Sequence, residues 1–428
     1  MLGVSSYTLH EWDDLPIFQE ARALRRVARA GCARPQFVTE PVASALHAVA
    51  ERAQTRLRTP QAVLARTAKP SLRAGQVVGV VAAPGATLEI LPKIDAEDGK
   101  VRTALIHMLA AAWDIHIAEG EIAALAKQRI DLLEILISLF STRLLAAVRG
   151  GLPRRYIAHQ EDLRKLRGKL DVTRQFTQLL MRPDLLACHF DELSENTPLN
   201  RVFKATVTLL RNRARTHANR RRLDELSARL EFVDESPAPL RESVRLDRTN
   251  TAFHELFQLA RTFLQGDWQA TNQGKSPGYA LLFPMNDLFE KFIARTLIRA
   301  GLPATVRIQP KSEYALEGEN GNRRFQLNPD LLVDGSVVID TKWKELKPNE
   351  RNFGVTQGDV YQMLAYANAY DAERLVLLYP WHARLGEAAK GVLHRWTVAG
   401  KPTPFHIATV DIGHPPGVAG ALRQIIES

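Results

Sequence analysis

The chain has 428 residues, of which 45% are hydrophobic and 24% are charged, and its formal net charge is +10. This composition is ordinary for a globular protein, and the length allows about three domains of ~150 residues each. No apolar run approaches the ~20 residues needed to cross a bilayer, and the N-terminus lacks the pattern of a signal peptide. We therefore expect a cytoplasmic protein without membrane contact. The two cysteines, Cys32 and Cys188, exclude a disulfide framework and a cysteine zinc site.

The positive charge is concentrated in two stretches. From Arg201 to Arg222 there are eight Lys or Arg residues and no Asp or Glu, and a second basic stretch runs from Arg143 to Arg174. Basic surfaces attract DNA because neutralised phosphates release their counterions. A solvated helix face is an equally good interpretation of either stretch taken alone, so both interpretations stay open.

The pattern along the chain predicts a multidomain protein with three regions. Residues 1–98 form a β-rich domain, in which Gly75–Ile94 is a hairpin around the turn Pro84-Gly85. Residues 99–280 are mainly helical, and one helix starts at Thr197, a capping hydroxyl followed by proline. Residues 281–428 form an α/β domain with a mixed central sheet. Its expected elements are a helix over 284–301, strands near 304–309 and 312–318, a hairpin over 325–344, a helix over 356–371 and a strand over 374–380.

The predicted hairpin over residues 325–344, "FQLNPDLLVDGSVVIDTKWK", carries charges that packed strands rarely hold. Asp340 and Lys342 are two positions apart, so both point to one face of their strand. A two-residue turn at positions 334–335 would place Asp330 opposite Ile339, on the wrong face. A three-residue loop over 334–336 would instead place Asp330 opposite Asp340. We expect the longer loop, because two adjacent carboxylates suit a hard cation such as Mg²⁺.

The same hairpin resembles a known nuclease motif. Pro329-Asp330, followed after nine residues by Asp340-Thr341-Lys342, resembles the PD-(D/E)xK motif. The resemblance implies that Asp330, Asp340 and the Thr341 carbonyl hold Mg²⁺, for which Mn²⁺ can substitute. It also implies that Lys342 orients the attacking water. Because the motif is short, surface acids at strand ends remain the alternative.

Three further residues extend the candidate site. Members of this fold often place another acid near the metal on the helix before the sheet, which is the position of Glu290. We expect Glu290 to complete the metal shell through water, although a solvated helix acid is an equally good interpretation. Gln362 and Tyr366 match the Gln-x-x-x-Tyr helix motif of the RecB-like branch, and their spacing puts them on one helix face. This match implies that they position the substrate or the lysine. Their neighbours Asp359 and Tyr361 are interpreted as surface residues without a role.

Longer phrases resemble the McrC family, the nuclease subunits of McrBC-type modification-dependent restriction systems. The resemblance covers residues 75 to 370 approximately and rests on "LEILPKI" (88–94), "LRGKLDV" (166–172), "FDELSENTPLNRVFKATV" (190–207), "LLFPMNDLFEKFI" (281–293) and "DTKWK" (340–344). It implies a metal-dependent endodeoxyribonuclease that cuts DNA with its C-terminal domain. It also implies that the N-terminal half, with residues 1–98 as the expected contact, stimulates a hexameric AAA+ GTPase, McrB.

The chain itself is not expected to hydrolyse nucleotide. Its nearest approach to a phosphate loop is Gly274-Lys275-Ser276, but Gln269 stands where the first glycine of that motif belongs. The alternative from another functional class is a non-catalytic regulator or scaffold of an AAA+ motor. The intact set of Asp330, Asp340 and Lys342 argues against an idle nuclease site.

Overall fold

The computed structural model describes residues 5–18, 37–57, 59, 61–94, 98–115, 117, 120, 122, 131–248, 250–267, 278–301 and 305–428. The near-match to a phosphate loop at 269–276 lies outside this part of the chain. The chain divides into two compact units, Met1–Leu132 with Ala270–Ser428, and Leu133–Gln269. This division groups the chain differently from the predicted segments 1–98, 99–280 and 281–428. Within the described ranges, no helix is long and apolar enough to span a bilayer.

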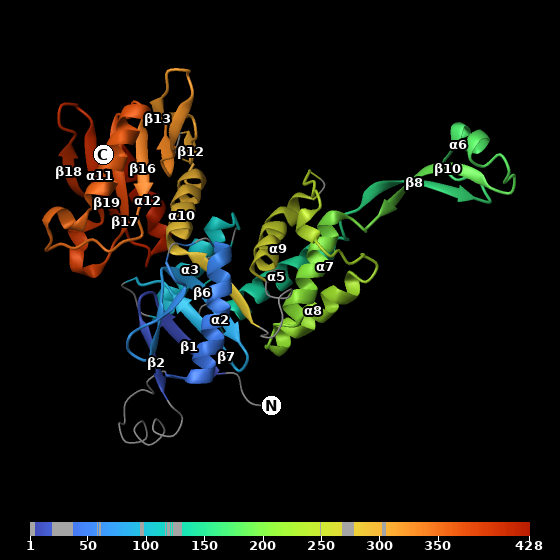
Figure 1. The fold of residues 1–428 in the computed structure, drawn as a ribbon, viewed down its shortest axis with the longest axis horizontal. Helices are drawn as coiled ribbons and strands as arrows, with labels where there is room; N and C mark the ends of the chain where they lie inside the picture. Colours follow the sequence, from blue (N-terminus) through green and yellow to red (C-terminus); the bar gives the residue numbers. More distant parts are fainter. Residues whose placement is uncertain are drawn as a thin grey trace. The chain divides into compact units, whose positions relative to one another are not determined.

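The first unit begins with a β-rich part. One sheet has the order β1 (Ser5–His10), β7 (Ala86–Leu91), β6 (Val77–Ala83) and β11 (Tyr279–Pro284), and a second has the order β3 (Val38–Thr39), β2 (Asp14–Phe18), β5 (Ser71–Ala74) and β4 (Leu64–Arg66). The predicted hairpin around Pro84-Gly85 is confirmed as β6 and β7. Helix α2 (Glu40–Leu57) buries Leu46 and Ala50 in the same core as these strands (Figure 1).

Strand β11 joins this sheet to the C-terminal part of the same unit. It pairs antiparallel with β6, and Gly79 of β6 has no room for a side chain because the carbonyl oxygen of Leu281 would lie 2.0 Å from its Cβ. Helix α10 (Met285–Arg299) follows β11 directly and packs against α3 (Asp98–Ala112). The buried face predicted for this helix is confirmed: it consists of Leu288, Phe289, Phe292, Ile293 and Leu297.

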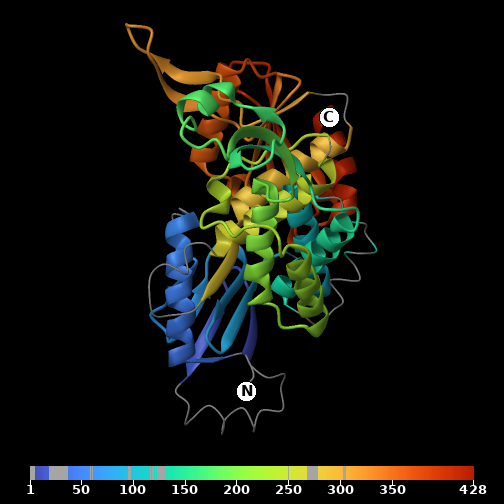
Figure 2. The same ribbon diagram turned by 90° about the vertical axis from the view of Figure 1, so that its right-hand side faces the viewer.

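The C-terminal part contains a central sheet of six strands, and this sheet is mixed, as predicted. Its order is β12 (Val306–Ile308), β15 (Leu331–Val333), β16 (Val337–Thr341), β17 (Arg374–Pro380), β19 (Pro404–Val410) and β18 (Gly391–Thr397). Strands β16, β17 and β19 are parallel, and the outer pairings are antiparallel. A separate hairpin, β13 (Glu313–Glu317) with β14 (Arg323–Leu327), extends away from the sheet and is coloured orange in Figure 2.

Helices cover both faces of the six-stranded sheet. Helix α11 (Gln357–Ala369) packs Met363 and Tyr366 into a core with Val338 and Leu377. Helix α10 contacts β16 and β12, and it also packs on α12 (Pro415–Glu427). Short 3-10 turns in the described residues lie at Pro239–Arg241 (η1), Thr251–Phe253 (η2), Arg351–Gly354 (η3), Ala383–Leu385 (η4) and Glu387–Ala389 (η5).

The second unit combines a helical body with a long hairpin. The helices are α5 (Leu132–Val148), α7 (Pro198–Arg211), α8 (His217–Arg229) and α9 (His254–Asp267). The predicted start of α7 is confirmed, because the Asn200 N–H donates to the Thr197 hydroxyl at 3.3 Å. Strands β8 (Arg155–Leu163) and β10 (Leu186–Ser194) enclose β9 (Lys169–Leu170) and α6 (Val172–Thr177). We name residues 155–194 the arm; it extends from the helices in Figure 1 and was not predicted.

Several basic residues of Arg201–Arg222 have partners within this unit. Arg201 pairs with Glu242 at 2.8 Å, and Arg211 pairs with Asp224 at 2.6 Å. Arg222 donates to the Ser138 and Ser141 hydroxyls. These three arginines therefore connect elements of the unit, a role that neither interpretation of that stretch included.

Candidate active site

The loop between β15 and β16 sets the geometry of the site. Leu331 lies opposite Ile339 and Val333 opposite Val337, so the loop comprises the three residues 334–336 that were predicted. Asp334 and Gly335 adopt φ angles of 50° and 75°, which turn the chain sharply. The register carries Asp330, one residue before β15, to the position across from Asp340. The two carboxylates therefore belong to one face, as the three-residue loop requires.

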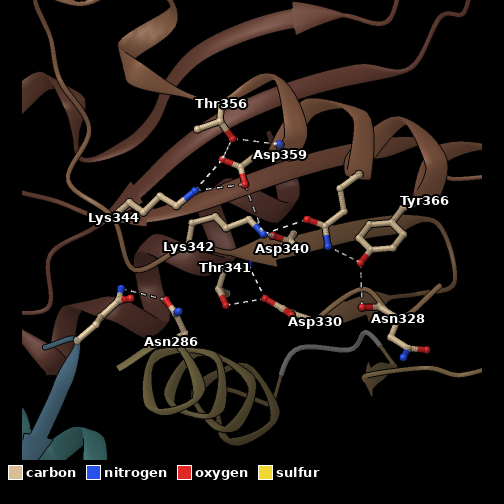
Figure 3. Close-up of polar contacts among 12 residues, drawn as sticks. Asn286, Asn328, Asp330, Asp340, Thr341, Lys342, Lys344, Thr356, Asp359 and Tyr366 are labelled. Carbon is tan, nitrogen blue, oxygen red and sulfur yellow. Dashed lines mark hydrogen bonds and ion pairs between the residues drawn. The ribbon is translucent and has the colours of Figure 1, made fainter. Parts of the chain in front are cut away.

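Thr341 fixes the carboxylate of Asp330. Its backbone N–H and its hydroxyl both donate to Asp330 Oδ2, each at 2.7 Å (Figure 3). Both residues line a pocket of about 280 Å³. The pocket is lined by Asn286, Glu290, Asp330, Asp340, Thr341, Lys342, Lys344, Asp359 and Gln362. The structure thus brings all the predicted site residues except Tyr366 into one pocket.

The ammonium group of Lys342 lies among three polar side chains. Its Nζ is 2.8 Å from Asp340 Oδ2 and 3.7 Å from Asp359 Oδ1, and it donates to Gln362 Oε1 at 3.1 Å (Figure 3). Burial alone would lower the pKa of Lys342, but the carboxylates of Asp340, Asp359 and Asp330 outweigh burial and raise it. The lysine therefore stays charged at neutral pH and is held in place by its partners.

Three acids of the pocket, Asp330, Asp340 and Glu290, bind protons more tightly than ordinary carboxyls. Burial, followed by the charge of Asp330, raises the pKa of Asp340 to about 6. The same two causes raise the pKa of Glu290 to about 7. Burial also raises the pKa of Asp330, although the bonds from Thr341 act in the opposite direction. Raised carboxyl pKa values in one pocket are typical of a functional site.

Gln362 and Tyr366 connect Lys342 to the backbone that precedes Asp330. Gln362 Nε2 donates to Tyr366 Oη at 2.7 Å, and Tyr366 Oη donates to the Asn328 carbonyl at 3.0 Å. Burial raises the pKa of Tyr366 to about 12, so the phenol remains a neutral donor. Gln362 and Tyr366 thus hold Lys342 in place through hydrogen bonds. Tyr366 itself does not line the pocket.

Asp359 is a residue whose role the sequence interpretation missed. It is buried, accepts from the Thr356 hydroxyl at 2.6 Å and pairs with Lys344 at 3.1 Å. Asp359 is the third residue of α11; its backbone N–H donates to the hydroxyl of the N-cap Thr356, and its side chain faces the same pocket as Gln362. The Thr-x-x-Asp capping pattern and the spacing of three residues to Gln362 are signals that could have found it. Tyr361, in contrast, is 60% exposed, as expected.

The donor set fits a divalent cation bound by two carboxylates. Asp340 Oδ2 is buried and receives no hydrogen bond of ordinary angle, although Lys342 Nζ lies 2.8 Å away as an ion pair. Among the residues described, no three His, Cys, Asp or Glu side chains gather into a ready-made metal site. Mg²⁺ commonly uses one or two carboxylates together with waters and substrate phosphates. Glu290 accepts a hydrogen bond from Gln309 Nε2 at 2.7 Å, and it would then not bind the cation directly.

Comparisons with known proteins show which family the chain resembles. A family model described as "McrBC 5-methylcytosine restriction system component" matches residues 72–380. No curated protein matches the chain. The fold is similar to McrC bound to McrB AAA+ hexamers from Thermococcus gammatolerans, with a TM-score of 0.67, 22% identity and 99% of both chains covered.

A second similar structure is the McrBC complex of Thermococcus gammatolerans. That match has a TM-score of 0.54 and 25% identity, and it covers 70% of this chain and 88% of the other. The family model spans well over half of the sequence and includes the strand end that carries Asp340 and Lys342. The chain therefore belongs to the McrC family of McrBC 5-methylcytosine restriction system components.

Proposed function

We propose that this chain is the Mg²⁺-dependent DNA endonuclease subunit of a McrBC-like restriction system and acts with an AAA+ NTPase hexamer. The observation that carries the proposal is the convergence of Asp330, Asp340 and Lys342 in one pocket at the end of β16. Two carboxylates without a paired arginine, next to a charged lysine, suit a site that handles a metal ion and a phosphodiester. The substrate class is therefore DNA, and the reaction is hydrolysis of its backbone.

Each residue has a separate task in this proposal. Asp330, Asp340 and the Thr341 carbonyl would hold Mg²⁺ or Mn²⁺. When bound, such a cation supplies Lewis-acid stabilisation of charge on the phosphate. Lys342, kept charged by Asp340 and held by Gln362, places its Nζ where it can orient a water and offset negative charge. Thr341 keeps the Asp330 carboxylate in its orientation.

The arm supports the proposal of a protein partner. Its outer part exposes a cluster of apolar side chains, which we name the arm tip: Leu166, Leu170, Val172, Phe176, Leu180 and Met181. Exposed apolar clusters of this kind mark interaction surfaces. The McrC structure from Thermococcus gammatolerans is bound to McrB AAA+ hexamers, and we infer an equivalent partner for this chain. The arm tip is then a contact in addition to the one expected for residues 1–98.

The test is cleavage of modified DNA by the purified chain with its AAA+ partner, with and without Mg²⁺. We expect Mg²⁺-dependent cleavage by the natural chain and a loss of about 10²–10⁴-fold for Lys342→Ala, the range of a positioned proton-transfer or water-orienting group. Lys347→Ala is the matched control, because Lys347 is an exposed lysine nearby that pairs with Glu350. Both variants should stimulate the partner's NTPase normally.

Two outcomes would overturn the proposal. Full cleavage by a folded Lys342→Ala variant would show that the active site is not the pocket around Lys342. Normal NTPase stimulation without any cleavage by the natural chain would instead favour the regulator alternative.

A further inference from the structure

We propose that Glu11 and Gln76, from the N-terminal sheets, are positioning residues of the nuclease site that act by holding Trp343. This inference rests on the proposed function, because it concerns the placement of Lys342. Trp343 follows Lys342 directly and points to the opposite side of the chain. Its indole lies against Phe289 of α10, with ring centroids 5.4 Å apart.

Glu11 holds the side chain of Trp343. It lies in the turn between β1 and β2, is completely buried, and its Oε2 accepts from Trp343 Nε1 at 3.0 Å. The same oxygen accepts from the Lys93 backbone N–H at 3.1 Å. Burial raises the pKa of Glu11 to about 8, although both hydrogen bonds favour the charged form. Trp343 is therefore bonded to a residue 332 positions earlier in the sequence.

Gln76 holds the backbone of the same residue. Its Nε2 donates to the Trp343 carbonyl at 2.6 Å and lies 3.3 Å from Asn286 Oδ1 on α10. The Gln76 carbonyl accepts from the Met285 N–H at 3.2 Å. Gln76 is itself fixed, because Gly75 before it packs so closely that a Cβ would lie 2.1 Å from the Ala62 carbonyl oxygen.

Together these contacts fix the chain on both sides of Lys342. On the preceding side, Thr341 is tied to Asp330, and the Lys342 N–H donates to the Leu378 carbonyl at 2.9 Å. On the following side, Trp343 is held by Glu11 and Gln76. Misplacement of a catalytic group by ~1 Å costs about 10²-fold in rate. The contacts from Glu11 and Gln76 would therefore affect the rate of cleavage by fixing the position of Lys342.

The contact between Glu11 and Trp343 is a hydrogen bond, and this supports a positioning role for Glu11 over simple packing. A buried carboxyl is unfavourable unless its oxygens are bonded, and Glu11 Oε1 is buried without a hydrogen-bond partner. An apolar side chain would fill this space at lower cost in free energy. What the carboxyl group of Glu11 adds is a directional hydrogen bond from the indole nitrogen, which fixes the orientation of Trp343.

The experiment uses the full chain with its AAA+ partner and compares Glu11→Ala, Glu11→Gln and Gln76→Ala. We expect Glu11→Ala and Gln76→Ala to lower kcat by about 10–100-fold, as loss of a supporting hydrogen bond does at metal sites, with KM for DNA unchanged. Glu11→Gln keeps an accepting oxygen and should stay within about threefold. Asp13→Ala is the matched control, since Asp13 is an exposed acid in the same turn.

A double-mutant cycle identifies the partner of Glu11. In a Trp343→Phe background the indole donor is gone, so Glu11→Ala should have no further effect on kcat. Hydrogen exchange of the segment around residues 338–346 gives a readout that does not depend on cleavage. Glu11→Ala should increase exchange there while exchange in α11 and the thermal midpoint change little.

Wild-type kcat in both alanine variants, or an effect of Glu11→Ala that is equal in the natural chain and in the Trp343→Phe background, would refute the positioning role. A lower thermal midpoint with normal kcat would assign these residues to stability alone. If the natural chain cleaves no DNA, the proposed function fails. The exchange of residues 338–346 then decides separately whether Glu11 and Gln76 hold this segment.

Discussion

The end of β16 and the arm tip depart from ordinary burial in opposite directions. Asp340 is only 2% exposed although its carboxyl can be charged, whereas Met181 is 88% exposed although it is apolar. A buried charge is compensated within the chain, here by Lys342. An exposed apolar cluster is compensated by a partner that covers it. The comparison therefore separates the proposed active site from the proposed partner contact, and the two should respond differently to substitution.

The largest effect is expected at the buried charge. Asp340→Asn removes a proposed metal ligand, and we expect cleavage to fall by more than the ~10²-fold that supporting residues of metal sites contribute. Folding should persist. Because the pKa of Asp340 is raised to about 6, its charged form lowers the free energy of unfolding above pH 6, and the asparagine removes that charge. Cleavage rates and thermal midpoints check both parts, with Asp411→Asn, an acid after β19 paired with Lys390, as the control. Unchanged cleavage would contradict the metal site.

At the arm tip the expected effect is on the partner alone. Phe176→Ser combined with Met181→Ser should weaken stimulation of the partner's NTPase by about 30-fold, the size of one interface hot spot of ~2 kcal/mol. The thermal midpoint should hold, because both side chains are exposed. Phe232→Ser is the control, since Phe232 is equally exposed in the same unit but outside the arm. Normal stimulation by the double variant would exclude the arm tip as the contact.

The pH dependence of cleavage gives a smaller and graded effect. Because metal binding needs deprotonated carboxylates and the pKa of Asp340 is raised to about 6, cleavage at low Mg²⁺ should fall about tenfold per pH unit below 6. Added Mg²⁺ competes with the proton and should move the decline to lower pH. Rates measured from pH 5 to 8 at two Mg²⁺ concentrations test this, and a decline that Mg²⁺ does not move would point to another group.

The smallest effect separates two tyrosines of α11. Tyr366→Phe removes the bond to the Asn328 carbonyl and should lower the free energy of unfolding by about 1 kcal/mol, with a modest fall in cleavage. Tyr361→Phe should change neither quantity, because Tyr361 is mostly exposed. Denaturant unfolding of the two variants provides the comparison. Equal stability of both would show that the Asn328 contact contributes nothing.

Local patterns were sufficient to predict much of the C-terminal part. The alternation of β16 puts Asp340 and Lys342 on one face, and only a three-residue loop brings Asp330 opposite Asp340. The four-residue spacing of Gln362 and Tyr366 likewise predicts their shared helix face. These inferences hold because each depends on residues close in sequence.

Features that depend on distant residues were not predictable in this way. Nothing near Trp343 indicates that Glu11 bonds to it, and nothing near Tyr279 indicates that β11 completes a sheet with β6. The arm was missed for a different reason. Strand β8 has no fully buried residue and strand β10 has only three, so they lack the strong apolar alternation by which a half-buried strand is identified.

The three-residue loop at 334–336 makes chain length at this position as important as residue identity. Loops usually tolerate insertions and deletions, and Ser336 could be exchanged for many residues without altering the strands. Deletion of a single residue here would instead shift the register by one and turn Asp330 away from Asp340. Among natural relatives, position 336 should therefore vary in sequence while the length of the loop stays constant.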